Sequence, residues 1–298
     1  MSRQHYCRLR HGILLVGLLI IPSNVARAEI VLTGDNDPTY TGGTTWTING
    51  ELSIGNTADG TMTVDNTYKV TSKNSFIGRE AGATGDVLVS GVNSQWTTSF
   101  LDVGLWGDGS LRIEDMAVLD SLDSTIGHLQ DSSGTVWVNG AGATWINMHG
   151  ITVGDRGDGA LYIEAGGVVD AGGDVIVQHP LYSGTGEAWV RGAGSTLTVG
   201  DRLTIDGRLH IENGGYVQAG GSTTVGVSDT ASAAITFDQG TLDTDSLYTA
   251  SDGLMGVGVI NTNHFFGDVD QVYNAATPAV QQFHFDTLPG QDVTVNLT

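Results

Sequence analysis

The chain has 298 residues, with 12 basic and 33 acidic side chains and a formal net charge of −21. This acidic excess argues against nucleic-acid binding, because a DNA- or RNA-binding surface needs clustered Lys and Arg. Glycine is abundant, at 44 residues, while proline is rare, at five, and no three-residue period occurs, which excludes collagen and argues against extended disorder. The polar residues are largely Ser, Thr, Asn and Gly, so the composition favours β-structure over helices.

The first 28 residues have the three parts of a secretory signal peptide. Three arginines precede a run of nine apolar residues at positions 13–21, and Ala26-Arg27-Ala28 then forms a cleavage site. The apolar run is too short for a membrane span, which needs about 17–25 residues. Cleavage after Ala28 removes four of the 12 basic residues, none of the acidic residues and the only cysteine, which leaves a net charge of −25. We therefore expect an exported chain without a transmembrane segment.

From about residue 59 to residue 226 the sequence repeats every 25 residues or so in two alternating forms. One form opens with Asp-Gly and the other with Ser-Gly or Thr-Gly. Both continue with alternating apolar and polar residues, a turn, and an apolar-x-apolar-Gly close. Strict alternation predicts half-buried strands, and three short strands in 25 residues predict one coil of a right-handed parallel β-helix. A propeller with blades of about 40–50 residues is the alternative, which the even spacing of the two forms disfavours.

Counting from the opening glycine of each repeat predicts the register of the strands. The second and fourth residues after it are apolar in all seven repeats, so we expect them to point inward and the third to point outward. The inward pairs are Met62/Val64, Val87/Val89, Leu111/Ile113, Val136/Val138, Leu161/Ile163, Ala188/Val190 and Leu209/Ile211. Three large residues at matching later positions are also expected in the core: Trp96, Trp145 and Leu197.

These patterns divide the mature chain into two parts. Residues 29–226 form the expected repeat domain, with the parallel β-helix beginning at about residue 42. Residues 227–298 form a C-terminal β section, expected to be irregular or antiparallel, that continues or caps the solenoid. A cap is expected because an open solenoid end exposes unpaired strand backbone.

The repeat resembles one shared by passengers of type V secretion systems (autotransporters) and by PEP-CTERM-associated surface proteins of bacteria. The segments that carry the resemblance are Asp158–Val169 (DGALYIEAGGVV), Gly91–Trp96 (GVNSQW), Gly140–Trp145 (GAGATW) and Gly192–Leu197 (GAGSTL). It covers roughly residues 55–226. The resemblance implies an exported β-solenoid at the surface of a bacterium with an outer membrane, and it brings no catalytic motif. Because the sequence has neither an autotransporter barrel nor a Pro-Glu-Pro sorting tail, we expect either a longer gene product or release without an anchor.

No residue pattern predicts catalysis or metal binding. The six histidines of the mature chain have no HxH or HxxxH spacing and no cysteine beside them, so we expect them to be solvated or locally hydrogen-bonded; they are His128, His149, His179, His210, His264 and His284. The segment Gly154–Gly159 (GDRGDG) superficially resembles a calcium-binding repeat, but Asp-Gly pairs are ordinary turn residues. We expect no catalytic, cofactor-binding or metal-binding residues and no enzyme activity. A β-helix carbohydrate-active enzyme with a carboxylate pair is the least favoured alternative.

Three aromatic residues occupy the outward third position in consecutive repeats: Trp137, Tyr162 and Trp189. Such rings can stack on sugars or pack against a protein. They can also simply stabilise the outer face of the sheet, which is the interpretation we favour. The sequence therefore predicts a structural or adhesive protein that is secreted or displayed at the cell surface. The alternative is a polysaccharide-binding module, and the expected partner is an extracellular polysaccharide or a cell-surface protein.

The residue before each opening glycine alternates between an acid and a hydroxyl in the order Asp59, Thr84, Asp108, Ser133, Asp158, Thr185, Asp206. With about 4.8 Å between coils, this alternation keeps the carboxylates about 9.6 Å apart. At the longer distance their repulsion is largely screened by salt. We hypothesise that the two repeat forms exist partly to separate these acids.

Overall fold

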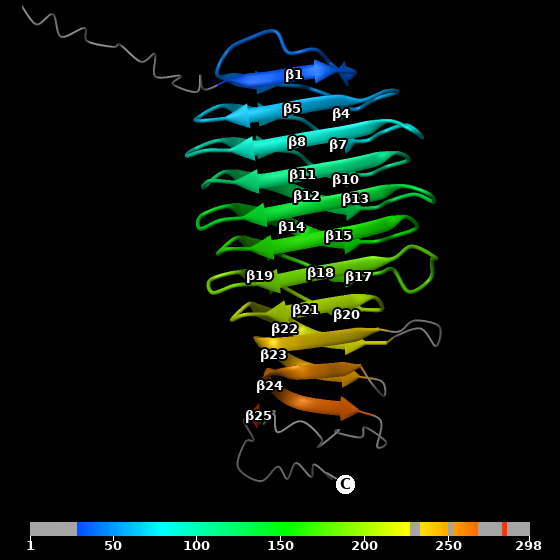
Figure 1. Ribbon diagram of the computed structural model, residues 1–298, viewed down its shortest axis with the longest axis vertical. Coiled ribbons are helices and arrows are strands. Elements are labelled where there is room, and N and C mark those ends of the chain that lie inside the picture. Colours follow the sequence, from blue (N-terminus) through cyan, green and yellow to red (C-terminus); the bar gives the residue numbers. More distant parts are fainter. Residues whose placement is uncertain (1–28, 227–232, 250–252, 268–281, 285–298) are drawn as a thin grey trace, which may run out of the picture.

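The computed structural model describes residues 29–226, 233–249, 253–267 and 282–284, so the predicted signal peptide lies outside the described residues. The described residues contain no helix, and their strands stack into one long parallel β-solenoid of about 25 residues per coil (Figure 1). It follows that none of them forms a helix of the length and apolarity needed to cross a membrane.

Short strands follow one another along the described chain, as the alternating pattern predicts. Their bounds are β1 (Ile30–Gly34), β2 (Asn36–Asp37), β3 (Thr45–Thr47), β4 (Glu51–Ile54), β5 (Gly60–Asp65), β6 (Lys69–Thr71), β7 (Asn74–Ile77), β8 (Thr84–Ser90), β9 (Gln95–Thr97), β10 (Phe100–Val103), β11 (Asp108–Glu114), β12 (Val118–Ile126), β13 (Ser133–Asn139), β14 (Thr144–Val153), β15 (Asp158–Glu164), β16 (Val168–Ala171), β17 (Val175–Val177), β18 (Gly186–Arg191), β19 (Thr196–Val199), β20 (Leu203–Ile205), β21 (Arg208–Glu212), β22 (Tyr216–Val225), β23 (Ala234–Thr249), β24 (Leu254–Gly267) and β25 (Gln282–His284).

The strands form three parallel stacks, here named the first, second and third sheets. The first sheet holds β5, β8, β11, β13, β15, β18, β21 and the starts of β23 and β24. The second holds β3, β6, β9, β16, β19, β25, the starts of β12, β14 and β22, and the middles of β23 and β24. The third holds β4, β7, β10, β17, β20 and the ends of the five long strands. Each coil thus contributes one segment to each sheet, which confirms the predicted parallel solenoid.

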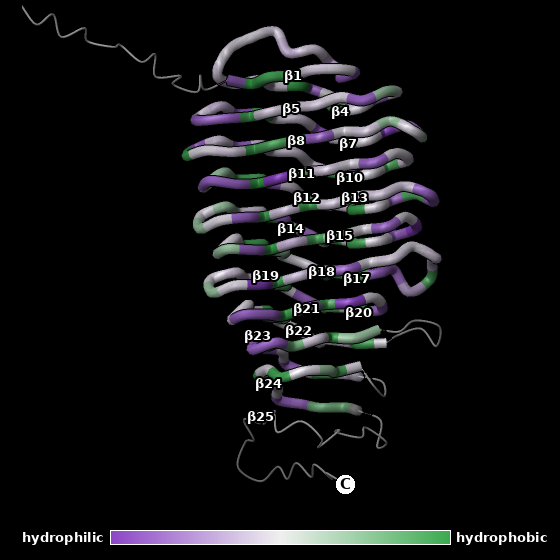
Figure 2. Tube along the Cα trace, viewed as in Figure 1, coloured by the Kyte–Doolittle hydropathy of each residue, from purple (hydrophilic) through white to green (hydrophobic). Residues whose placement is uncertain are grey.

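The core contains the side chains that the repeat predicts. All seven inward pairs are buried, and so are Trp96, Trp145 and Leu197. The opening glycines lie in register from Gly60 to Gly186, one coil apart at each step. Figure 2 shows hydrophobic and hydrophilic residues recurring along the coils. The period-two pattern therefore gives the correct register, and one continuous apolar core runs through the stack.

The glycine that closes a coil answers a steric requirement of the stack. Gly154 follows β14 with a φ of 74°, and a Cβ atom built there would lie 2.1 Å from the carbonyl oxygen of Thr185 in the next coil. No side chain fits at that distance without moving backbone, and the positive φ itself favours glycine. The apolar-x-apolar-Gly close thus lets the third sheet turn tightly into the first.

The two ends of the solenoid are built differently. At the N-terminal end, β1 pairs antiparallel with β5, and β2 pairs antiparallel with β4, so the edge of the first complete coil is covered. At the other end, β23 and β24 continue the parallel stacking in the described ranges 233–249 and 253–267. The expectation of an irregular or antiparallel section from residue 227 is therefore wrong for these residues, because their apolar alternation is sufficient to fill two more coils. Residues 285–298 lie outside the described residues.

Candidate functional site

The first candidate site is an aromatic ladder on the outer surface of the first sheet. The ring centroids of Trp137 and Tyr162 are 5.6 Å apart and those of Tyr162 and Trp189 are 4.5 Å apart, with interplanar angles of 9° and 10°. His210 extends the stack at 5.1 Å from Trp189, and the guanidinium of Arg112 lies 4.9 Å from the Trp137 ring. The prediction that the three aromatic side chains lie at one outward position of consecutive coils is confirmed, and Arg112 and His210 extend the row to five members.

The geometry of the ladder limits what it can bind. Parallel rings only 4.5–5.6 Å apart lie face to face, because rings laid edge to edge would need more than the spacing between strands. Each internal ring therefore has both faces covered by its neighbours, and Arg112 covers the outer face of Trp137. Stacking on a sugar needs an open ring face. The arrangement favours the interpretation that the ladder stabilises the sheet.

The surroundings of the ladder shift the pKa values of Tyr162 and His210. Arg191 lies 2.5 Å from a carboxylate oxygen of Glu164, and its guanidinium is 5.9 Å from the Tyr162 ring. Burial, together with the nearby carboxylate of Glu187, raises the pKa of Tyr162. Burial also lowers the pKa of His210, so the imidazole at the end of the ladder is neutral near pH 7. Both rings thus stay uncharged in the stack.

The alternation of acids and hydroxyls is present in the structure, with one exception. Asp108, Ser133 and Asp158 lie in register on successive coils, and the Thr185 hydroxyl donates a 2.6 Å hydrogen bond to Asp158. Asp206, however, is buried, whereas the earlier acids of the series are exposed. The reason is the short link between β20 and β21, which has none of the loop found at the other coils. The charge-spacing hypothesis therefore applies only to the earlier coils.

A second candidate site, which the sequence analysis missed, is an open groove at the corner between the second and third sheets. One hollow of about 680 Å³ is lined by Met148, His149, Gly150, Gly172, Gly173, Asp174, Asp201, Arg202 and Gly221. A second hollow of about 550 Å³ is lined by Gln218, Ala219, Gly220, Asp243, Thr244, Asp245, Asn261, Thr262 and Asn263. Gly221 lines the first hollow and the adjacent Gly220 lines the second, so the two hollows are neighbours along the solenoid. We call the combined feature the corner groove.

Glycines form much of the floor of this groove. A Cβ atom at Gly172 would lie 2.5 Å from the Met148 carbonyl oxygen, and one at Gly173 would lie 2.2 Å from that of His149. Successive coils approach too closely here for side chains, so the backbone itself is left at the surface. The Gly-Gly pairs 172–173 and 220–221 are the sequence signal that could have indicated the groove.

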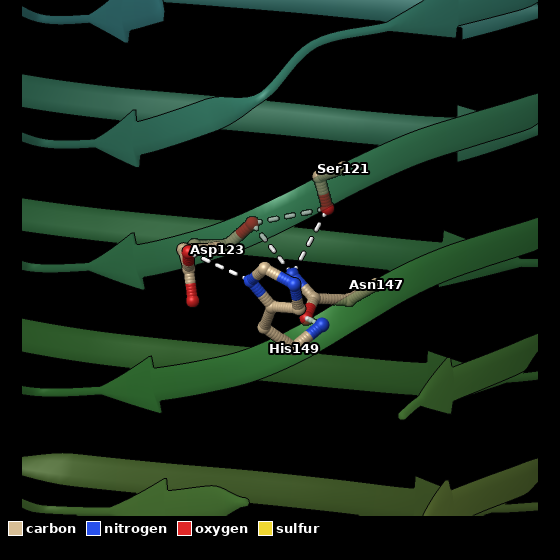
Figure 3. A network of polar contacts seen from close by, with 5 residues as sticks. Ser121, Asp123, Asn147 and His149 are labelled. Carbon is tan, nitrogen blue, oxygen red and sulfur yellow. Dashed lines mark hydrogen bonds and ion pairs between the residues drawn. The ribbon is translucent and has the colours of Figure 1, made fainter. Parts of the chain in front are cut away.

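A buried polar network holds the upper end of the corner groove (Figure 3). The Asn147 side-chain amide donates hydrogen bonds to the hydroxyls of Ser121 and Ser124, at 3.0 and 3.1 Å. Its carbonyl oxygen accepts a hydrogen bond from the backbone N–H of His149 at 3.2 Å. The His149 ring in turn lies 3.1 Å from a carboxylate oxygen of Asp123. The network therefore holds the His149 backbone through Asn147 and its exposed imidazole through Asp123.

Further along the groove, an exposed ion pair joins two coils. The Arg202 guanidinium donates a 2.7 Å hydrogen bond to Asp174, and the Arg202 backbone N–H donates another at 3.0 Å to the second carboxylate oxygen. These contacts lower the pKa of Asp174 and raise that of Arg202. Asp201 lies beside the pair with its side chain exposed. Asp174 therefore stays ionised at all but strongly acid pH.

The lower part of the groove pairs carboxylates with amides from the next coil. Asp243 accepts hydrogen bonds from the Tyr216 hydroxyl and from the Asn261 amide. Burial, reinforced by this contact with Asp243, raises the pKa of Tyr216 to about 12. Asp245 accepts a 3.1 Å hydrogen bond from Asn263, and the pKa of Asp245 is lowered chiefly for that reason. The Asp-x-Asp and Asn-x-Asn segments thus form two short polar ladders.

The histidines have local partners rather than a shared site. His128 lies 2.8 Å from a carboxylate oxygen of Asp102, and this contact raises the pKa of His128. His179 stacks on Tyr182 in the loop after β17, with centroids 4.6 Å apart. Within the described ranges, no three His, Cys, Asp or Glu side chains are grouped so that they could hold a metal ion. His284 belongs to β25, of whose side chains nothing is described.

Comparison of the chain with protein-family models, with curated proteins and with solved structures finds no match.

Proposed function

We propose that this chain is an exported β-solenoid, displayed at the cell surface or released, with a structural or adhesive role. The observation that carries the proposal is the architecture: one continuous core stacked from repeats that contact only their neighbours. Such a stack presents a long, stiff surface, which is what solenoid proteins use to span distance and hold partners. The signal-peptide pattern of residues 1–28 supports export.

The aromatic ladder supports the structural side of this role. Its rings cover one another, and it follows the solenoid axis through five successive coils. Cross-strand aromatic pairs stabilise a sheet by about 0.2–1 kcal/mol each, so the row stiffens the stack against bending and fraying. We therefore assign Trp137, Tyr162 and Trp189 to stabilisation of the first sheet rather than to glycan binding.

The acidic net charge is consistent with display of many copies of the chain on a cell surface. Eight basic residues against 33 acidic ones in the predicted mature chain keep such rods apart through mutual repulsion. Repulsion between like rods is useful for a protein that is present at high density on a surface. Because the solenoid itself is acidic, we expect its binding partner to be neutral or cationic.

Expression of the full chain in a bacterium with an outer membrane tests the proposal. N-terminal sequencing of the extracellular or surface-exposed protein should begin at Glu29, and cells carrying the protein should differ in adhesion from cells without it. A matched variant with Leu15→Arg and Leu19→Arg interrupts the apolar run and should remain inside the cell. Recovery of the unmodified chain in the cytoplasm, with Met1 in place, would refute export.

A further inference from the structure

We propose that the corner groove binds a linear, neutral glycan through hydrogen bonds to its hydroxyl groups. The proposal gives the adhesive role a ligand class, but the binding itself does not depend on export. It rests on the shape, the polar lining and the charge of the groove.

The shape suits a chain-like ligand. The two hollows of about 680 and 550 Å³ lie at the same corner and follow one another along the solenoid axis. From the coil of His149 to the coil of Asn263 there are five steps, which is about 24 Å at the usual spacing between strands. The groove is open along its length and therefore accepts several linked sugar rings without requiring a chain end.

The lining suits hydroxyl groups. Exposed carboxylates and amides, such as those of Asp201, Gln218 and Asn263, accept or donate hydrogen bonds at intervals set by the coil repeat. Between them the glycine positions leave backbone at the surface, so a ligand can approach closely. A carboxylate that accepts hydroxyl protons makes stronger hydrogen bonds than a neutral acceptor.

The charge of the groove selects against acidic polysaccharides. Four carboxylates, those of Asp174, Asp201, Asp243 and Asp245, line it together with a single guanidinium, that of Arg202. A uronic-acid polymer would bring like charges within a few ångströms of them, which is unfavourable even in water. A neutral glycan avoids this repulsion.

A glycan also fits the groove better than a protein partner does. Protein interfaces gain most of their energy from buried aromatic and large apolar anchors. Met148 is the only large apolar side chain in the lining of the two hollows, and the remaining residues are polar or small. The floor therefore offers hydrogen bonds but almost no apolar surface to bury.

Calorimetry on the purified full-length chain tests the inference directly. The probes are neutral hexasaccharides of β-1,4-linked glucose, β-1,4-linked mannose and β-1,3-linked glucose, with hexagalacturonate as the acidic comparison. At least one neutral probe should bind, and hexagalacturonate should not. The double variant Asp201→Ala, Gln218→Ala removes two exposed polar groups of the lining and should weaken binding at least about tenfold, since a hydrogen bond to a charged group is involved.

Two controls separate this site from others. Asp108→Ala removes an exposed acid from the corner between the third and first sheets and should leave binding unchanged. The pair Trp137→Ala, Trp189→Ala disrupts the aromatic ladder, and the affinity of the molecules that remain folded should also be unchanged. A loss of binding in either control equal to that of the groove variant would overturn the assignment.

Four further outcomes also count against the inference. They are the absence of binding by every neutral probe, preferential binding of hexagalacturonate, binding that EDTA abolishes, and a groove-dependent protein complex without glycan binding. The experiment uses the purified chain, so its outcome does not depend on export. If the chain is exported but binds no neutral glycan, this inference is refuted and the proposed function is not.

Discussion

The corner between the second and third sheets is built in two different ways in the upper and lower coils. In the upper coils, the side chains that point inward at this corner are polar: Ser72, Thr98, Ser121 and Asn147 are all buried. In the next three coils the matching positions hold Ala171, Val199 and Ala219. Neighbouring coils pair in parallel in both regions, yet the upper corner holds a buried hydrogen-bond network, whereas the corner groove runs over the coils of Ala171, Val199 and Ala219.

The inward position is polar again in the two coils after Ala219, where Thr244 and Thr262 are buried, so the apolar residues interrupt a polar row only in the middle of the stack. A buried hydroxyl or amide must find partners, and here it finds them in the neighbouring coils and in the indole N–H groups of Trp96 and Trp145. A small apolar residue makes no such demand. Glycines can then follow it, as they do after Ala171 and Ala219, and the backbone of successive coils approaches closely.

The largest expected effect is the loss of the core tryptophan that joins the upper network. Trp145→Ala should lower the free energy of unfolding by about 4 kcal/mol, because it leaves a cavity and removes the 2.8 Å hydrogen bond to Ser121. Leu197→Ala, at the matching position in the lower coils, should cost about 3 kcal/mol. Urea denaturation of both variants measures the difference. A larger loss for Leu197→Ala would mean that the indole hydrogen bond does not contribute.

The second-largest expected loss of stability comes from adding a side chain where the backbones of successive coils approach closely in the lower corner. Gly172→Ala should cost about 2 to 3 kcal/mol, because its Cβ atom would lie 2.5 Å from the Met148 carbonyl oxygen and backbone would have to shift. Met148→Ala, one coil earlier at the matching position, changes a side chain that is 64% exposed and should stay within about 0.5 kcal/mol. Thermal melts of the two variants give the comparison. Equal melting temperatures would show that the coils can separate at this corner without cost.

An exchange of inward residues gives a third, smaller effect. Ser121→Ala leaves the donors of Trp145 and Asn147 without their shared acceptor, which should cost about 1 to 2 kcal/mol. Ala171→Ser places a hydroxyl in the apolar lower corner and should also destabilise the chain. Denaturation midpoints of the single variants test both directions. If Ala171→Ser is neutral, the lower corner has polar partners to spare and the contrast between the regions is weaker.

The aromatic ladder crosses from the upper into the lower coils and should contribute about equally to both. Tyr162→Leu keeps apolar contact but removes both stacking interactions of the central ring, so we expect a loss of about 1 kcal/mol. Tyr162→Trp restores a flat ring and should recover the loss. Thermal unfolding followed by circular dichroism measures both variants. An unchanged melting temperature for Tyr162→Leu would remove the ladder from the account of stability.

The smallest effects are opposite pH dependences of two histidines in the two regions. The hydrogen bond to Asp102 raises the pKa of His128, so its stabilisation is complete below the unfolded pKa of 6.5 and is lost as the pH rises through the folded value. Burial lowers the pKa of His210, so stability is lost as the pH falls from 6.5 through its folded value.

Melting temperatures between pH 5 and 8 separate the two cases. His128→Gln should remove the fall in stability that the parent chain shows at the higher pH values, and His210→Gln should remove the fall at the lower ones. The same pH profile for both variants would contradict the assignments. The His128 side chain is 33% exposed, so solvent screens the contact with Asp102 and limits the size of the effect.

Much of the solenoid was predictable because its repeat is local. The alternation around Leu111 and Ile113 fixes which face is buried, since a shift by one residue would place the whole apolar set in water. The same counting places Trp137, Tyr162 and Trp189 in one outward row. That the row would be a closed stack was not predictable, because the tilt of each ring depends on the rings above and below it.

The corner groove and the N-terminal cap were decided only by the tertiary structure. Between Ser121 and Asp123 the pairing with the next coil shifts by one residue, so counting from the opening glycine fails at that corner. Strands β1 and β2 carry no repeat, and they pair antiparallel with β5 and β4 of the first complete coil. Sequence periodicity therefore determined the strands, their inward faces and the sheet to which each belongs. The corners and the ends depend on turn length and on contacts between coils, which a periodic pattern does not encode.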